Sequence, residues 1–134
     1  MSNITTVILA AGKSSRFKGS ISKLLFPLCG LPIISHIYEV ARKISGKNII
    51  VVCNEDNITE LKPILKNCKF VIQKNQLGTA HAFKKTKNKI NTENILVLFG
   101  DTPLIETSNL KKLIKKFNSS KSIASIIAFK TANP

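Results

Sequence analysis

The sequence predicts an α/β protein of three layers, α/β/α, in which helices cover both faces of a mostly parallel, Rossmann-like sheet. Short runs of β-branched and apolar residues alternate along the chain with longer amphipathic stretches. The apolar runs are continuous, as expected for strands that are buried on both faces. The 134 residues, 43% of them hydrophobic, are enough for one domain with a core and too few for two ordinary ones.

The first half of the chain contains two expected strands and one long helix. Ile4–Ala10 is a β-branched run and predicts the first strand, followed by a loop over residues 11–22 that is rich in Gly, Ser and Lys. Pro32–Ser45 carries apolar residues at helical spacing and predicts a helix. Asn48–Cys53 predicts the second strand.

The middle of the chain repeats this alternation. Asn57–Lys66 predicts a helix, and Pro63 inside it indicates that the helix starts late or kinks. Phe70–Ile72 predicts a brief strand. Thr79–Lys89 predicts a further helix, with Thr79 as its N-cap.

The last part of the chain completes the expected sheet. Asn94–Phe99 predicts a fourth strand, Ser108–Phe117 a fourth helix and Ser122–Phe129 a fifth strand, which we expect to form an exposed edge. In such sheets ligands bind beyond the carboxyl ends of the strands, so the segments that follow the strands are the candidates for a functional site.

The net charge of +14 raises the question of nucleic-acid binding. Lysine outnumbers arginine nineteen to two, and the chain is also rich in Ile and Asn, which like Lys have A/T-rich codons. We interpret the two densest lysine groups as solvated helix faces, and the charge as at most a general attraction for polyphosphate ligands. The residues of these two groups are Lys84, Lys85, Lys87, Lys89, Lys111, Lys112, Lys115 and Lys116.

The cysteines and the absence of export or membrane signals predict a cytoplasmic protein with reduced thiols. Cys29, Cys53 and Cys68 form no CxxC pair, and neither His36 nor His81 has zinc-ligand spacing to them. The N-terminus lacks a basic region ahead of its short apolar stretch. No apolar run approaches the ~18–20 residues of a membrane span, so we expect no membrane partner.

The segment after the first strand, LAAGKSSRF (Leu9–Phe17), has the composition of an anion-binding loop. Small residues at Ala10, Ala11 and Gly12 allow close approach of the backbone to a ligand, and Lys13 and Arg16 add positive charge for a triphosphate. The segment matches neither the Walker A pattern nor GxGxxG. An ordinary surface loop would explain it equally well.

Two further segments follow in places where a ligand would bind. Lys23 opens an apolar connection into the first long helix, although alone it reads as one solvated lysine among many. Asp101, in Gly100-Asp101-Thr102-Pro103, ends the fourth expected strand and is placed to hold Mg²⁺ against phosphate oxygens. The alternative role for Asp101 is a turn or N-cap residue. Asp56 is the other aspartate, so a second carboxylate for a metal is scarce.

Four segments occur in an order that resembles the sugar-nucleotide pyrophosphorylase family. They are LAAGKSSRF, SKLLFPLCGLPI, QKNQLGTAHA (residues 73–82) and FGDTPL (residues 99–104). The chain is most similar to the N-terminal half of the uridyltransferase domain of bacterial N-acetylglucosamine-1-phosphate uridyltransferases. LAAGxxxR is shared with many relatives, whereas QxxQLGTxHA followed by GDxPL is more particular to the uridyltransferases. The resemblance covers nearly the whole chain.

The resemblance implies a nucleotide site with Mg²⁺ as cofactor and UTP as ligand. Leu9, Ala10, Ala11 and Gly12 would cradle the nucleotide, with Lys13 in the same loop. The residues implied to act on the phosphates, the base and the metal are Arg16 and Lys23 for the phosphates, Gln73 for the uracil ring, Gly78 and Thr79 near the base, Phe99 and Gly100 in the lining, and Asp101 for Mg²⁺.

The implied reaction joins UTP to N-acetylglucosamine 1-phosphate and releases pyrophosphate. It proceeds by positioning and charge neutralisation, so it requires no protein nucleophile, and we interpret His81 as structural. The base specificity stays open, because an amide such as that of Gln73 can be flipped to suit another ring.

The resemblance also has departures. Ser22 stands where the family often has proline, and residues 131–134 lie where the family continues into Gly-Tyr-Gly. We therefore expect residues 1–134 to form a single nucleotide-binding half, without the acceptor half or the acetyltransferase domain. Three hypotheses follow: an enzyme completed by a second chain or by its own dimer, a non-catalytic nucleotide-binding remnant, and, more weakly, a basic nucleic-acid-binding protein.

Overall fold

The computed structural model describes residues 3–12, 22–128 and 130. By their contacts the residues form two units, Met1–Leu104 and Ile105–Pro134. The first unit contains the sheet and the expected site segments, and the second contains one helix.

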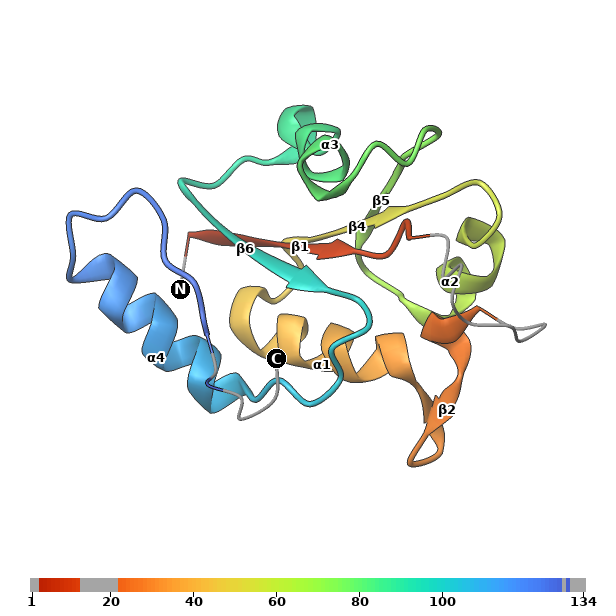
Figure 1. The fold of residues 1–134 in the computed structure, drawn as a ribbon, viewed down its shortest axis with the longest axis horizontal. Helices are drawn as coiled ribbons and strands as arrows, with labels where there is room; N and C mark the ends of the chain where they lie inside the picture. The colour runs from red at the N-terminus through yellow and green to blue at the C-terminus, as the bar shows by residue number, and fades with distance from the viewer. Residues whose placement is uncertain (1–2, 13–21, 129, 131–134) are drawn as a thin grey trace. The chain divides into compact units, whose positions relative to one another are not determined.

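A parallel four-stranded sheet forms the centre of the first unit (Figure 1). Its strands are β1 (Ile4–Leu9), β4 (Ile49–Cys53), β5 (Lys69–Ile72) and β6 (Asn94–Phe99), in the spatial order β5-β4-β1-β6. All three pairings are parallel. The α/β class and the mostly parallel sheet predicted from the apolar runs are confirmed.

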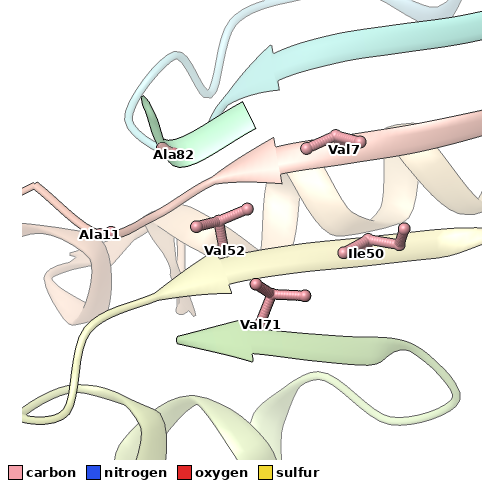
Figure 2. Packing of buried hydrophobic residues seen from close by; sticks show 6 residues of the cluster. All are labelled: Val7, Ala11, Ile50, Val52, Val71 and Ala82. Carbon is pink, nitrogen blue, oxygen red and sulfur yellow. The ribbon is translucent and has the colours of Figure 1, made fainter. Parts of the chain in front are cut away.

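The two central strands show why continuous apolar runs mark this fold. Every residue of β4 is buried, and in β1 only Leu9 retains intermediate exposure. On one face of the sheet, side chains from three strands pack together with Ala11 and Ala82 in a single buried cluster (Figure 2). The strand residues of this cluster are Val7, Ile50, Val52 and Val71. Residues buried on both faces have no reason to alternate with polar ones.

Helices lie on both sides of the sheet. Figure 1 shows α1 (Ile33–Ser45) on one side and α3 (Thr79–Lys84) on the other. The C-terminal end of α1 is tied to β1, because the Ser45 hydroxyl donates to the Thr6 hydroxyl oxygen at 2.8 Å. The helix stops at Gly46, whose φ of 61° suits a residue without a Cβ. This arrangement gives the three predicted layers.

Short elements connect the layers. A 3₁₀ turn, η1 (Lys23–Leu25), leads into the antiparallel pair β2 (Pro27–Leu28) and β3 (Leu31–Pro32). The helix predicted over residues 57–66 is α2 (Ile58–Ile64), which ends one residue after Pro63.

The helix predicted over Thr79–Lys89 is shorter than expected. α3 ends at Lys84, and a separate 3₁₀ turn, η2, follows at Lys87–Lys89. Thr79 is the first helical residue and not the N-cap. The cap position belongs to Gly78, whose φ of 95° is a conformation that residues with a side chain rarely adopt.

The second unit contains α4 (Thr107–Asn118), which extends the predicted helix by one residue at each end. The strand predicted over residues 122–129 is wrong for the part that the structure describes: residues 122–128 are irregular, and Phe129 lies outside the described residues. Ile123 is fully exposed. A β-branched run becomes a strand only where a neighbouring strand pairs with it, and residues 122–128 have none within the described chain.

No helix in the described part of the chain has the length and apolar character needed to cross a membrane.

Candidate functional site

An open cavity of about 610 Å³ lies where the sheet strands end. It is lined by the residues that follow β1 and β5, by the last residue of β6, and by parts of η1 and α3. The lining residues are Leu9, Ala10, Ala11, Gly12, Lys23, Leu24, Gln73, Gln76, Gly78, Thr79, Ala82, Phe99 and Asp101. Segments far apart in sequence meet here because parallel strands bring their carboxyl ends to one edge.

Every predicted site residue that the structure describes lines this cavity, with the exception of Gly100. Lys13 and Arg16 lie outside the described residues. Sequence reasoning assigned no role to three lining residues, Leu24, Gln76 and Ala82, although all three lie inside the segments it singled out.

Gly100 lies next to the cavity, between the lining residues Phe99 and Asp101. Its N–H donates to the Leu9 carbonyl at 2.9 Å, which joins the ends of β1 and β6. A Cβ built on Gly100 would lie 2.8 Å from Ile34 Cδ1, 3.2 Å from the Leu9 carbonyl oxygen and 3.3 Å from Leu24 Cδ2. Only glycine fits here without displacing neighbours, so Gly100 sets the position of the turn that carries Asp101.

Two buried asparagines hold the loop that follows β1. Asn57 donates from its side-chain amide to the Ala10 carbonyl at 2.8 Å, and Asn54 donates to the Ala11 carbonyl at 3.3 Å. Each asparagine also accepts a bond from the other's backbone N–H, at 2.8 Å and 3.0 Å. Sequence reasoning missed both; their polar type directly after a buried strand was the available signal.

The bonds from Asn54 and Asn57 orient the backbone of the loop. In a trans peptide the C=O and the following N–H point in opposite directions. The carbonyls of Ala10 and Ala11 point to the asparagines, so the N–H groups of Ala11 and Gly12 point away from them. Two successive N–H groups in a loop that lines a cavity suit an anionic ligand.

Lys23 and Asp101 form an ion pair in the cavity. The Lys23 ammonium donates to Asp101 Oδ2 at 3.0 Å, and both side chains are nearly half exposed. An exposed pair of this kind contributes at most ~1 kcal/mol to stability, because water screens both charges. The pair therefore leaves both groups ready to exchange partners with a ligand.

Asp101 fits a divalent cation in one particular way. It is the only carboxylate among the residues that line the cavity, and no cluster of three His, Cys, Asp or Glu side chains occurs in the described residues. A cation here would take one carboxylate from these residues and its other ligands from phosphate oxygens and water. Mg²⁺ in nucleotide sites is commonly held in this manner.

Gln73 directly follows β5 and is almost completely buried. Its amide nitrogen contacts the Gly78 carbonyl at 3.2 Å and His81 Nδ1 at 2.9 Å. His81, interpreted from the sequence as structural, thus contacts the residue that was assigned to the base.

The three thiols are not in the cavity lining, and all are free. Burial raises the pKa of the Cys53 and Cys68 thiols to about 11, so both stay protonated at neutral pH. Cys53 is buried, whereas Cys29 is exposed in the turn between β2 and β3.

The model of the MobA-like NTP transferase domain matches residues 6–133. The chain belongs to this family. Among its curated relatives is the "Bifunctional protein GlmU" of Buchnera aphidicola subsp. Acyrthosiphon pisum (strain Tuc7), which is 41% identical over 138 residues. That of Clostridioides difficile (strain 630) is 35% identical over 133 residues. Each match covers 98% of this chain, and it covers 28% and 29% of the two relatives, respectively.

This family member therefore spans less than a third of the length of these two relatives. Among solved structures, a putative glucose-1-phosphate thymidylyltransferase from Bacillus anthracis has a TM-score of 0.79 at 18% identity. The match covers 88% of this chain and 51% of that one. At this identity the similarity shows a shared fold. Family and fold together identify a nucleotidyltransferase-like domain related to GlmU.

Proposed function

We propose that this chain binds a nucleoside triphosphate, UTP, in the cavity at the ends of the strands, as the nucleotide half of a uridyltransferase. The observation that carries the proposal is the meeting of four separate predicted segments around one cavity, with Lys23 and Asp101 in contact inside it. A cation and a carboxylate that face the same open space are what a polyphosphate with its metal requires.

The proposal gives different parts of the cavity lining different roles. The loop from Leu9 to Gly12 offers backbone N–H groups to the phosphates, with its carbonyls turned to the asparagines. Lys23 leaves Asp101 for the nucleotide and neutralises charge at the α-phosphate. Gln73 follows β5, at the opposite edge of the sheet from β6, and would meet the base there.

Asp101 would hold Mg²⁺, which when bound neutralises phosphate charge and orients the triphosphate. In the proposed reaction an oxygen of the sugar phosphate attacks the α-phosphorus, and pyrophosphate leaves. Positioning and charge neutralisation drive such a displacement, so the site needs no protein nucleophile.

The acceptor of the proposed reaction is N-acetylglucosamine 1-phosphate, as the resemblance to the uridyltransferases implies. None of the described cavity residues is assigned to this sugar phosphate. The alternative is a nucleotide-binding protein without turnover, which shares the same cavity residues. Release of pyrophosphate from UTP and the sugar phosphate separates the two.

Calorimetric titration of the full chain with UTP and Mg²⁺ tests nucleotide binding, with CTP and GTP as comparisons. We expect selective UTP binding that Lys23→Ala weakens by about tenfold, the loss of one charge-assisted phosphate contact. Lys47→Ala is the matched control, because it removes the same charge just before β4, at the opposite end of the strand from the cavity.

Other outcomes would contradict the proposal. Equal binding of all three nucleotides, weakened alike by both substitutions and by salt, would show only the attraction of a +14 chain for polyphosphate. Tighter binding of RNA than of any nucleotide would favour the nucleic-acid hypothesis.

A further inference from the structure

The Gln73 side chain is held by two contacts on the same atom. Its amide nitrogen lies 3.2 Å from the Gly78 carbonyl oxygen and 2.9 Å from His81 Nδ1. Its backbone is fixed too, since the Gln73 N–H donates to the Cys53 carbonyl at 2.8 Å. Only 3% of the residue is exposed, so the side chain has little freedom to choose other partners.

The Gly78 contact decides which way the amide is turned. A backbone carbonyl only accepts hydrogen bonds, so the amide atom that faces it must be the nitrogen and not the oxygen. Rotating the amide by half a turn would set two oxygens against each other.

The His81 contact uses the second hydrogen of the same nitrogen. Because the amide donates, Nδ1 must accept, and the ring of His81 is therefore neutral with its hydrogen on Nε2. Both amide hydrogens are then occupied within the protein, and the hydrogen-bonding capacity left to Gln73 is that of an acceptor.

The remaining atom of the amide is that acceptor, Oε1. No donor among the described residues bonds it, and the buried side-chain atom without a partner in this part of the chain is the Tyr38 hydroxyl oxygen, not Oε1. Because Gln73 lines the cavity, Oε1 is the amide atom left to bond a ligand there.

We propose that His81 is a positioning residue that commits Gln73 to offer the base an acceptor only, so that the site selects uracil over cytosine. Uracil carries a hydrogen on N3 and donates it to Oε1, whereas cytosine N3 has a lone pair that would face the same oxygen. This inference rests on the proposed function. With the orientation of the Gln73 amide fixed, bound cytosine would leave Oε1 buried without a donor. An unpaired buried polar group weakens binding, so the site would reject this base.

The test compares UTP and CTP affinities, by calorimetry, for the full chain and a set of variants. For the wild type we expect UTP to bind roughly five- to a hundredfold tighter than CTP. His81→Leu frees one amide hydrogen to donate to cytosine N3, and the UTP/CTP affinity ratio should fall at least about threefold. His81→Asn retains an acceptor in the place of Nδ1 and should keep the ratio within about twofold of the wild type.

A double variant separates positioning from general damage. If His81 acts through Gln73, then adding His81→Leu to Gln73→Ala should leave the ratio of the single Gln73→Ala variant unchanged. Thermal melts verify that each variant folds. A His81→Leu variant that weakens both nucleotides equally, with its ratio intact, would overturn the proposal and make His81 structural.

The same titrations test the role of His81 and the nucleotide site separately. UTP and CTP that bind equally well, at a site sensitive to Lys23→Ala, would leave the proposed nucleotide site standing and refute the role of His81. Binding that is insensitive to Lys23→Ala and follows salt alone would refute the nucleotide site itself.

Discussion

Gly100 illustrates how strongly one residue position is constrained in this site. The three atoms nearest to its missing Cβ belong to the fully buried Ile34 side chain, the Leu9 backbone and the buried Leu24 side chain. The nearest of them, Ile34 Cδ1 at 2.8 Å, belongs to a side chain with no exposed surface. Gly12 is the opposite case: a Cβ added there would have no atom of the described residues within 4 Å.

We therefore expect Gly100→Ala and Gly12→Ala to behave differently. Gly100→Ala should lower the free energy of unfolding by about 1–3 kcal/mol, as overpacking of a filled core does. Gly12→Ala should leave the stability within about 0.5 kcal/mol of the wild type, as for a residue with free surroundings. Urea unfolding followed by circular dichroism measures both. Equal stabilities for the two variants would mean that the packing around Gly100 is looser than described.

The sequence could predict which residues face the cavity but not which pairs form inside it. The sequence predicts Lys23 as a phosphate-binding residue and Asp101 as a metal ligand, but not that they form a pair. They are 78 positions apart, and only the spatial order of the strands brings them into contact. The link between Gln73 and His81 depends on the path of the loop through Gly78, which no periodicity encodes. Such contacts are long-range consequences of the fold and have no local signal.

At the scale of elements, the loop after β1 takes its shape from the segment between β4 and α2. Ala10 and Ala11 have no polar side chains with which to fix their own conformation. The carbonyl groups of both instead bond to the buried amides of Asn57 and Asn54. The segment that follows β4 is thus bonded to the loop that follows β1. The conformation of this loop depends on two asparagines that do not themselves line the cavity.

Removing one amide tests this dependence. Asn57→Ala leaves the Ala10 carbonyl and the Asn54 N–H without their partners, so it should lower the free energy of unfolding by about 1–3 kcal/mol and also weaken UTP binding. Asn48→Ala is the matched control, because Asn48 is exposed and lies just before β4, the strand that Asn54 follows. It should change the free energy of unfolding by less than about 0.5 kcal/mol. Chemical denaturation and calorimetry supply the two readouts. An Asn57→Ala chain with wild-type stability and wild-type affinity would show that the loop holds its shape without this amide.

Element prediction was most accurate for β6. The run Asn94–Phe99 was predicted to the residue, because a continuous apolar segment between polar ones has few alternatives. It failed over residues 122–128, where the β-branched pattern has no strand beside it. It also overextended α3, since the helical spacing of residues 79–89 continues past the point where the backbone turns at Lys85 and Thr86.

Two opposing properties govern the molecule as a whole. The net charge of +14 repels other copies, and both dense lysine groups are exposed as predicted. Against this, β6 forms an edge of the sheet and presents exposed apolar side chains, Ile95 (41%), Val97 (39%) and Phe99 (50%). Val97 pairs with Val7 in the register, so these residues share the face that carries the buried cluster (Figure 2). An uncovered apolar edge favours association, and charge opposes it.

Salt decides between these two forces, because it screens charge and leaves apolar contacts in place. The Debye length falls from about 10 Å at 0.1 M to about 3 Å at 1 M ionic strength. We therefore expect the mean mass measured by sedimentation velocity to rise between these two salt concentrations. Val97→Lys places a charge on the exposed face of β6 and should abolish the rise. Leu31→Lys adds the same charge to a more exposed position on β3, in the separate two-stranded pair, and should leave most of the rise intact. If both variants associate like the wild type, the β6 edge is not the contact surface; if mass falls as salt rises, charge attraction to a contaminating polyanion drives the association.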